Sequence, residues 1–265
     1  MIPRALTIAG SAAQGSAGIQ ADLKTFQERD VYGMAAVTAI VANNSVTDKG
    51  IFTHPVEAVK AQYYAALESV GIDALKTGML FTKEIIATVT ALLKDSSANN
   101  IVVDPVMIGK MGSQLLKDDA IELMKTDLFP LAEIITPNLH EAERILGEGK
   151  INSIDGMKEA AVKLYELGPA YVLVKGGARI ENATDILYDG KQFTELTYER
   201  FNTVHTSGAG CSYSAAITAE LAKHQTMEEA VRKAKAYVTA AIKYSLSFEK
   251  GIGSTYHAAY RKYGI

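Results

Sequence analysis

The chain has 265 residues, with 27 lysines and arginines against 30 aspartates and glutamates, a formal net charge of −3 and a single cysteine. This balance argues against wholesale binding to nucleic acid or to an anionic membrane surface, and one cysteine excludes an internal disulfide. The hydrophobic fraction of 48% is typical of a soluble globular protein.

The length favours one α/β domain over residues 1–265 rather than two small domains. The N-terminus lacks the layout of a signal peptide, and no apolar stretch is long enough to span a bilayer. We therefore expect a cytoplasmic protein.

Short apolar runs alternate with helical patterns along the first half of the chain. Residues 5–9 predict a buried strand that stops at Gly10, and a helix follows over about 19–29. Further strands are predicted at 37–42, which leads to Asn43, at 74–79, and at 101–103, which leads to Asp104. Amphipathic helices are predicted between these strands, with apolar residues three and four apart around 56–70 and 85–93.

The same alternation continues to the C-terminus. Strands are predicted at 134–138 and at 171–174, the second ending in Lys175, Gly176 and Gly177. Residues 185–188 and 193–196 flank an Asp-Gly turn and predict a β-hairpin at a sheet edge. A last long helix is expected over about 227–245. The fold class is therefore α/β, with a mainly parallel sheet between helical layers.

The chain is organised around residues 204–217, which predict a strand end, a glycine-broken turn and a helix of small residues. Gly208 and Gly210 allow close backbone approach, and the helix start would offer unpaired N–H groups to a phosphate or an oxyanion. Cys211 lies at that helix start, where the dipole is expected to stabilise a thiolate. A plain glycine turn followed by a small buried cysteine fits this stretch equally well.

Polar or glycine residues recur where the predicted strands end. Because open α/β sheets bind ligands at the carboxyl ends of their strands, this shared placement favours a functional site. Asp104 would be costly there without a cation or donors. Two signals also have simpler explanations: Asn138 and Glu141 have the spacing of a helix capping box, and most lysines like Lys175 lie on surfaces.

Several motifs, in the same order along the chain, resemble those of the hydroxymethylpyrimidine (phosphate) kinases and the similar pyridoxine/pyridoxal kinases of the ribokinase-like superfamily. The matching segments are 5–11 (ALTIAGS), 17–26 (AGIQADLKTF), 76–80 (KTGML), 103–107 (VDPVM), 135–142 (ITPNLHEA), 175–177 (KGG) and 208–211 (GAGC). The resemblance implies a three-layer αβα sandwich and ATP-dependent phosphorylation of a hydroxymethyl group on a small ring, first on 4-amino-5-hydroxymethyl-2-methylpyrimidine and then on its phosphate. Pyridoxine or pyridoxal is the alternative ring, or both rings are substrates.

The resemblance also implies a role for each matching residue. Cys211 would be the catalytic base, and N–H groups of Gly208, Ala209 and Gly210 would surround the transferred phosphoryl group. The remaining expected roles are ring binding by Gly10, Ala17, Asn43, Met79 and Val106, ATP binding by Asn138, Lys175, Gly176 and Gly177, and Mg²⁺ binding by Asp104 and Glu141.

Three departures from the family pattern involve four positions. Ala12 and Ala13 stand where the family usually has an aspartate and a small residue or proline, and Ser207 stands where a histidine is common. Asn43 replaces the glutamine typical of pyrimidine kinases; its shorter amide still favours a pyrimidine.

Two other classes of function remain open at this stage. Cys211 and His205 would form the dyad of a cysteine hydrolase, or the departures at Ala12 and Ser207 would leave a ring-binding protein without catalysis. The resemblance further suggests a homodimer, and the glycines at 109–113 would allow a mobile flap.

Overall fold

The computed structural model describes residues 2–95, 100–107, 116 and 118–264. The strands are β1 (Arg4–Ala12), β2 (Tyr32–Val41), β3 (Ile51–Thr53), β4 (Ala74–Thr77), β5 (Ile101–Val103), β6 (Ile134–Ile135), β7 (Tyr171–Lys175), β8 (Asp185–Tyr188) and β9 (Phe193–Leu196). The α-helices are α1 (Gly18–Glu28), α2 (Val56–Ser69), α3 (Lys83–Lys94), α4 (Asp118–Leu123), α5 (Leu139–Leu146), α6 (Ile154–Tyr165), α7 (Ala209–Ala222), α8 (Met227–Lys243) and α9 (Ala259–Tyr263). Short π and 3₁₀ turns occupy Met124–Leu128, Phe129–Leu131 and Glu181–Ala183.

The described strands form one sheet in the order β3-β2-β1-β4-β5-β6-β7-β8-β9. The six strands from β2 to β7 in this order pair in parallel, whereas β3, β8 and β9 pair antiparallel at the two edges. The chain moves to one side of β1 to build β2 and then to the other side to build β4. The sheet therefore has its switch point between β1 and β4, which is where open α/β sheets bind ligands.

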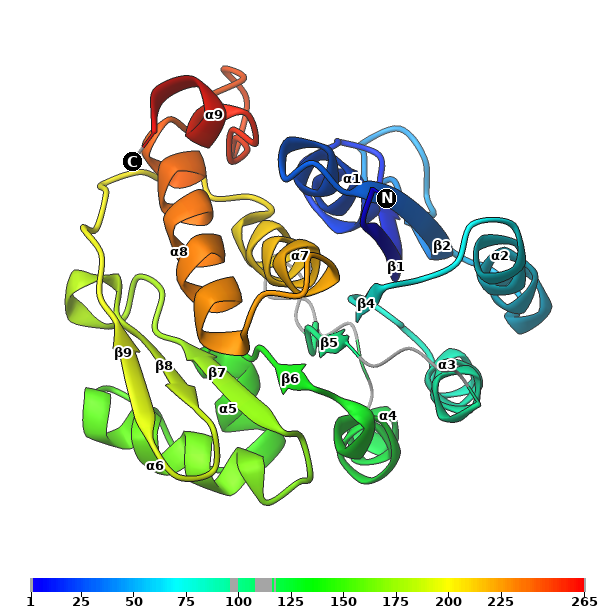
Figure 1. Cartoon of the computed structure of the whole chain (residues 1–265). Coiled ribbons are helices and arrows are strands. Elements are labelled where there is room, and N and C mark those ends of the chain that lie inside the picture. Colours follow the sequence, from blue (N-terminus) through cyan, green and yellow to red (C-terminus); the bar gives the residue numbers. More distant parts are fainter. Residues whose placement is uncertain (1, 96–99, 108–115, 117, 265) are drawn as a thin grey trace.

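Helices cover both faces of this sheet, as Figure 1 shows. Alternate residues of each strand point to opposite faces, so Leu75 and Val103 join one buried cluster while Ala74 and Val102 join the other. The first cluster includes residues of α2 to α6, and the second includes residues of α1, α7 and α8. The predicted three-layer αβα sandwich is confirmed.

The sequence of helix α7 shows no polar stripe, and the surroundings of the helix explain why. It packs against α1 and α8 as well as the sheet, and all its residues from Ser212 onward are buried. A helix surrounded in this way has no solvent face for a polar stripe to occupy. Small residues such as Ala215 and Ala216 let the neighbouring elements approach closely.

Some predicted boundaries were wrong. Residues 204–206 are not a strand; the chain is irregular there, and Ser207 makes only a single bridge to Ser254. Strand β2 begins at Tyr32, earlier than the apolar run at 37–42 indicated, because alternating exposed residues obscure its start. The short edge strand β3 and helix α6 were not predicted, and the flap suggested at 109–113 lies outside the described residues.

Within the described residues, the longest helices are too short or too polar to cross a bilayer.

Candidate active site

The N-terminus of α7 lies at the carboxyl edge of the sheet and forms the centre of the candidate site. Gly208 caps the helix with a φ of 82°, and a side chain there would overlap the carbonyl oxygen of Ser16. Only glycine meets both conditions without strain. The N–H of Ala209 donates to Thr206 O at 3.2 Å, so this donor is already engaged. Gly210 follows in the same first turn, where N–H groups have no partner within the helix.

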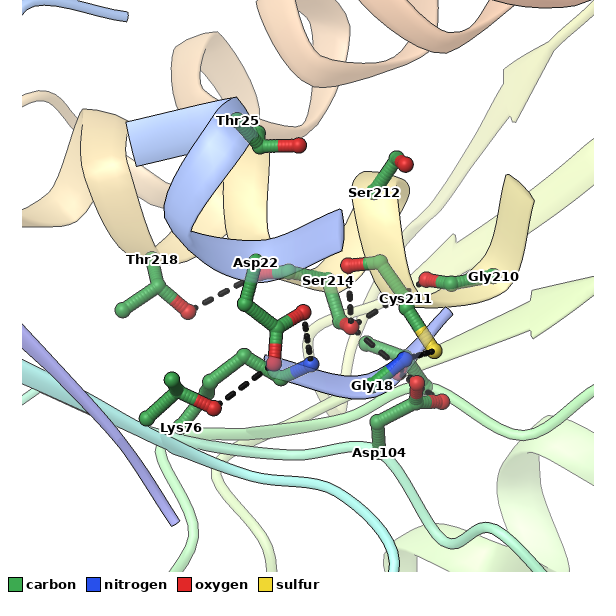
Figure 2. A network of polar contacts seen from close by, with 12 residues as sticks. Gly18, Asp22, Thr25, Lys76, Asp104, Gly210, Cys211, Ser212, Ser214 and Thr218 are labelled. Carbon is green, nitrogen blue, oxygen red and sulfur yellow. Dashed lines mark hydrogen bonds and ion pairs between the residues drawn. The ribbon is translucent and has the colours of Figure 1, made fainter. Parts of the chain in front are cut away.

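The sulfur of Cys211 points to a second helix. It accepts the N–H of Gly18, the first residue of α1, at 3.4 Å (Figure 2). The expectation that the helix terminus lowers the thiol pKa was wrong. Burial raises the pKa of Cys211 to about 11, although Lys76 acts in the opposite direction. Removal from water outweighs the nearby cation and the hydrogen bond from Gly18.

A buried ion pair that our sequence analysis did not single out lies beside this sulfur. Lys76 Nζ lies 2.7 Å from Asp22 Oδ1, with both side chains 0% exposed. Thr7 donates its hydroxyl to the other Asp22 oxygen at 2.7 Å. A signal was present, because Lys76 interrupts an apolar strand and Asp22 shares a helix face with Ile19 and Phe26.

A second network joins three further strand ends. Asp104 Oδ1 accepts Lys175 Nζ at 3.1 Å and the hydroxyl of Thr136 at 3.2 Å. Asp104 Oδ2 accepts the hydroxyl of Ser214, which comes from α7, at 3.1 Å (Figure 2). The structure therefore brings the predicted Asp104 and Lys175 into direct contact. Thr136 and Ser214, which complete the network, were not identified as site residues from sequence.

Lys175 lies between two carboxyl groups. Burial alone would lower its pKa, but Asp104 and Glu141 hold that pKa above its ordinary value. The ammonium group is therefore charged, and it lies close to Gly210: its nitrogen would be 3.5 Å from a side chain placed there. Lys175 is well placed to meet an anion at the start of α7.

Asn138 and Glu141 form the capping box whose spacing the sequence shows. Asn138 Oδ1 accepts the N–H of Glu141 at 3.0 Å, and Glu141 Oε2 accepts the N–H of Asn138 at 2.8 Å. Burial raises the pKa of Glu141 to about 8, partly opposed by Lys175. The two residues thus fix the start of α5, and the Glu141 carboxyl lies near Lys175 and Asp104.

The glycines after Lys175 make a tight turn. The N–H of Gly176 donates to Asp185 Oδ1 at 3.0 Å, and a side chain at Gly176 would overlap Thr184 O. This N–H is therefore engaged within the protein. Gly177 has a φ of 57° with open space around its α-carbon. Asp185 is itself held by Lys235 Nζ at 2.6 Å.

The predicted ring pocket is built around β1. A side chain at Gly10 would overlap the terminal methyl of Met79, and one at Gly18 would overlap Gly10 O. Ala17 caps α1, and Val106 lies half-buried after β5. Gly10 belongs to β1, whereas Met79 and Val106 follow β4 and β5. Gly10 O lies against Gly18, whose N–H bonds the Cys211 sulfur.

Asn43 lies in the loop after β2. Its amide oxygen packs against Gly50, where a side chain would overlap it. The loop that carries Asn43 is closed by a hydrogen bond from the N–H of Ala42 to Gly50 O at 2.7 Å. The amide position is therefore set by this loop as well as by strand β2.

The positions that depart from the family pattern have partners of their own. The N–H of Ala12 donates to Gln20 Oε1 at 2.9 Å, and the N–H of Ala13 donates to Val41 O at 2.9 Å. Ser207 shares a hydrogen bond of 2.9 Å with the hydroxyl of Ser16. The loop at 12–18 is thus anchored to α1, β2 and the residue before Gly208.

The structure does not assemble the cysteine hydrolase dyad. His205 Nδ1 accepts the N–H of Gly253 at 2.9 Å, while the Cys211 sulfur is directed to Gly18.

The residues present fit a magnesium ion that also binds phosphates. Mg²⁺ is usually held by one or two carboxylates together with substrate phosphates and water. Asp104 and Glu141 supply two such carboxyl groups, and their protein hydrogen bonds leave lone pairs uncommitted. Within the described residues no cluster of three or more metal-binding side chains exists, so such an ion would need ligands from the bound nucleotide.

Two surface hollows lie outside this cluster. One of about 520 Å³ lies between α1 and residues 246–258, and one of about 630 Å³ lies between α4 and α5. No predicted site residue lines either hollow.

Known proteins match nearly the whole chain. The family model described as phosphomethylpyrimidine kinase matches residues 13–256. The pyridoxine kinase of Bacillus subtilis is 45% identical over 263 residues, covering 97% of each protein. The hydroxymethylpyrimidine/phosphomethylpyrimidine kinase of the same organism is 42% identical, covering 98% of this chain and 97% of that protein.

A solved structure extends the similarity to three dimensions. The pyridoxal kinase of Staphylococcus aureus in complex with AMP-PCP and pyridoxal has a TM-score of 0.92 and 42% sequence identity, covering 99% of this chain and 96% of that one. The resemblance inferred from the motifs is confirmed, and so is the assignment to the phosphotransferases. This chain belongs to the phosphomethylpyrimidine kinase family.

Proposed function

We propose that this protein transfers a phosphoryl group from ATP to the hydroxymethyl group of 4-amino-5-hydroxymethyl-2-methylpyrimidine and then to its phosphate, as a step in thiamine biosynthesis. One observation carries the proposal. The start of α7 lies beside the cation Lys175 and carries the thiol of Cys211, whose sulfur accepts the N–H of Gly18. Gly18 in turn lies against Gly10, a residue of the predicted ring pocket. Phosphoryl transfer requires this combination of positioning and charge neutralisation.

The residues of the proposed site have different chemical roles. Lys175 and the first turn of α7 neutralise charge on the transferred group, while Gly10 and Met79 place the ring. As the substrate oxygen bonds to the γ-phosphorus and the bond to the bridging oxygen of ADP breaks, the hydroxyl proton passes to the Cys211 sulfur. The ionised sulfur is the form that accepts this proton, so burial of Cys211 makes the active form scarce at neutral pH.

Asp104 and Glu141 would hold Mg²⁺ together with the nucleotide phosphates. When bound, the ion would neutralise phosphate charge and orient the transferred group. Asn138 would lie near the same phosphates, because its capping box places it beside Glu141. Gly177, with open space around it, would allow the nucleotide to approach the turn after β7.

Pyridoxine or pyridoxal is the second candidate substrate, alone or in addition to the pyrimidine. The B. subtilis pyridoxine kinase and the hydroxymethylpyrimidine kinase are 45% and 42% identical to this chain, so overall identity favours neither ring. Asn43 supports the pyrimidine, because its amide can pair with the donor and acceptor of an aminopyrimidine edge.

We test the choice of ring with one assay on the whole protein. ATP consumption is measured with hydroxymethylpyrimidine, its phosphate, pyridoxine and pyridoxal, each with and without Mg²⁺. We expect turnover on both pyrimidines to exceed that on the pyridines and to require Mg²⁺. The variant Asn43→Met should shift the ratio of kcat/KM values toward pyridoxine. Turnover on the pyridines alone in the wild type would reject the pyrimidine assignment.

Two further expectations belong to the same proposal. The chain would act as a homodimer in the cytoplasm, where its one cysteine stays reduced. Light scattering of the purified protein measures the mass directly, and a monomer at assay concentration would contradict the dimer.

A further inference from the structure

The ion pair between Lys76 and Asp22 is poorly explained by stability. Both side chains are 0% exposed, and removing two charges from water costs several kcal/mol each before their attraction offsets it. Apolar side chains of similar volume would fill the same space without that cost. The position of the pair in the candidate site therefore suggests a functional role rather than a stabilising one.

Helix α1 links this pair to the catalytic sulfur. Gly18, its first residue, donates its N–H to Cys211 Sγ, and Asp22 lies one turn further along the same helix. Asp22 holds Lys76 Nζ at 2.7 Å, and the ammonium lies next to Gly78 at the end of β4, 3.7 Å from the position of an added side chain there. Figure 2 shows Gly18, Asp22, Lys76 and Cys211 gathered at the start of α1.

Four charged side chains from different elements influence the sulfur. Lys76 from β4 favours its thiolate, whereas Asp22 from α1 and Asp104 after β5 disfavour it. Lys175 from β7 is also close enough to interact with Cys211. Lys175 is already shared by Asp104 and Glu141, and in the proposed function it would face the nucleotide phosphates as well. Lys76 is then the cation whose position does not depend on the bound nucleotide.

We propose that Lys76, held in place by Asp22, is the positioning residue that sets the charge of Cys211 during proton transfer. The inference rests on the proposed role of Cys211 as proton acceptor. Lys76 does not touch the substrate or accept its proton. It acts through the sulfur: its fixed charge favours the thiolate to which the substrate hydroxyl proton is transferred. Asp22 has two functions, since it anchors the ammonium and also limits how far the thiolate is favoured.

The single cysteine allows this to be measured without substrate. Iodoacetamide alkylates the thiolate, so the rate of alkylation against pH reports the ionisation of Cys211 alone. We expect Lys76→Met to slow alkylation at a fixed pH below the midpoint by about tenfold or more, which is a shift of about one pKa unit upward. Asp22→Asn keeps a side chain able to bond Thr7 but removes the carboxylate that keeps the buried Lys76 charged, so it should slow alkylation as well.

A matched control distinguishes the effect of the Lys76 charge on Cys211 from the general effect of losing a buried ion pair. Lys235 and Asp185 form another buried pair at 2.6 Å, with side chains 7% and 3% exposed. Lys235→Met should lower the free energy of unfolding as Lys76→Met does, but leave the alkylation midpoint of Cys211 unchanged. Circular dichroism confirms that each variant is folded before alkylation.

The outcomes decide the proposal in every case. An unchanged midpoint in folded Lys76→Met, or equal shifts in the Lys76 and Lys235 variants, would overturn it. If Lys76→Met does not fold, Asp22→Asn decides alone, and faster or unchanged alkylation overturns the proposal. Failure of the proposed function is seen separately, as absence of phosphoryl transfer by the wild type while alkylation still reports on the sulfur.

Discussion

Cys211 is carried by the first turn of α7 and accepts a hydrogen bond from the first residue of α1, so two helix N-termini meet at its sulfur. Each favours negative charge there, yet burial raises the thiol pKa to about 11. The sequence predicted the start of α7 correctly but could not show that the sulfur lies against a second helix. That depends on Gly18, which folding brings from nearly 200 residues away.

Removing the thiol tests the role assigned to it. Cys211→Ala should lower kcat by about 10²- to 10⁴-fold, because a proton acceptor is lost while little packing changes. The dissociation constant for the ring substrate, measured by calorimetry, should stay close to that of the wild type. Cys211→Ser is the matched control for volume, and its hydroxyl is too weak an acid to supply the ionised base. An unchanged kcat in Cys211→Ala would exclude the cysteine as base.

Residues at strand ends were easier to predict than residues within elements. Asp104 and Lys175 stood out because a charge directly after a buried strand needs a partner, and the structure pairs them. Lys76 and Asp22 carry equally strong chemistry but lie inside a strand and a helix, where apolar residues dominate the pattern. A charged residue on an otherwise apolar face was the signal, and only packing could reveal its partner.

At the scale of elements, the site depends on how closely two backbone segments approach. The loop at 12–18 touches the turn before α7, where Ser16 O lies against the α-carbon of Gly208 and the Ser16 hydroxyl bonds Ser207. The motif at 208–211 predicted a close approach to a ligand. The structure shows that Gly208 is also required for contact within the protein.

We expect Gly208→Ala to lower the free energy of unfolding more than most substitutions that add a single methyl group. A residue with a side chain held at the φ of 82° costs about 1–3 kcal/mol. Overlap of the new methyl group with Ser16 O adds to this cost. Gly147→Ala is the matched control, because its φ is 66° but open space surrounds it. Urea unfolding should show a clearly larger loss of stability for Gly208→Ala. Equal losses would mean that the contact with the loop at 12–18 is unimportant.

A buried histidine couples the C-terminal segment to α7 and makes stability depend on pH. Burial lowers the pKa of His257 to about 4, and its Nε2 shares a hydrogen bond of 3.0 Å with the hydroxyl of Ser212. Since the folded pKa lies below the unfolded value, the unfolded chain binds the proton more readily. Stability is therefore retained above about pH 6.5 and lost as the pH falls toward 4, by at most about 3 kcal/mol.

His257→Gln tests this prediction, because its amide can still bond Ser212 but does not titrate. Urea unfolding at pH 7 and pH 4.5 should give a smaller difference for the variant than for the wild type. The exposed His140 offers a control, since His140→Gln should leave the pH dependence nearly as it is. A variant with the same pH dependence as the wild type would rule out His257 as the source.

At the scale of the whole molecule, the alternation of apolar runs and helical patterns was sufficient to predict the class of fold. It could not give the order of strands, which puts the switch point of the sheet between β1 and β4. The short strands were predicted unevenly: β5 was predicted with its exact bounds, β6 was predicted too long at 134–138, and the antiparallel edge strand β3 was missed. Such strands are defined by pairing with their neighbours rather than by their own residues.

The central claim is that these converging strand ends catalyse phosphoryl transfer from ATP to a hydroxymethyl group. Its most direct test follows the reaction of ATP and hydroxymethylpyrimidine by ³¹P nuclear magnetic resonance, with the wild type and Cys211→Ala compared in the presence of Mg²⁺. We predict that the wild type forms a phosphomonoester signal together with ADP, followed by the signals of a diphosphate as the second transfer proceeds. The variant should form both products far more slowly. The account would be contradicted if ADP and inorganic phosphate formed without any phosphorylated ring product, whether the ring supplied is hydroxymethylpyrimidine or pyridoxal.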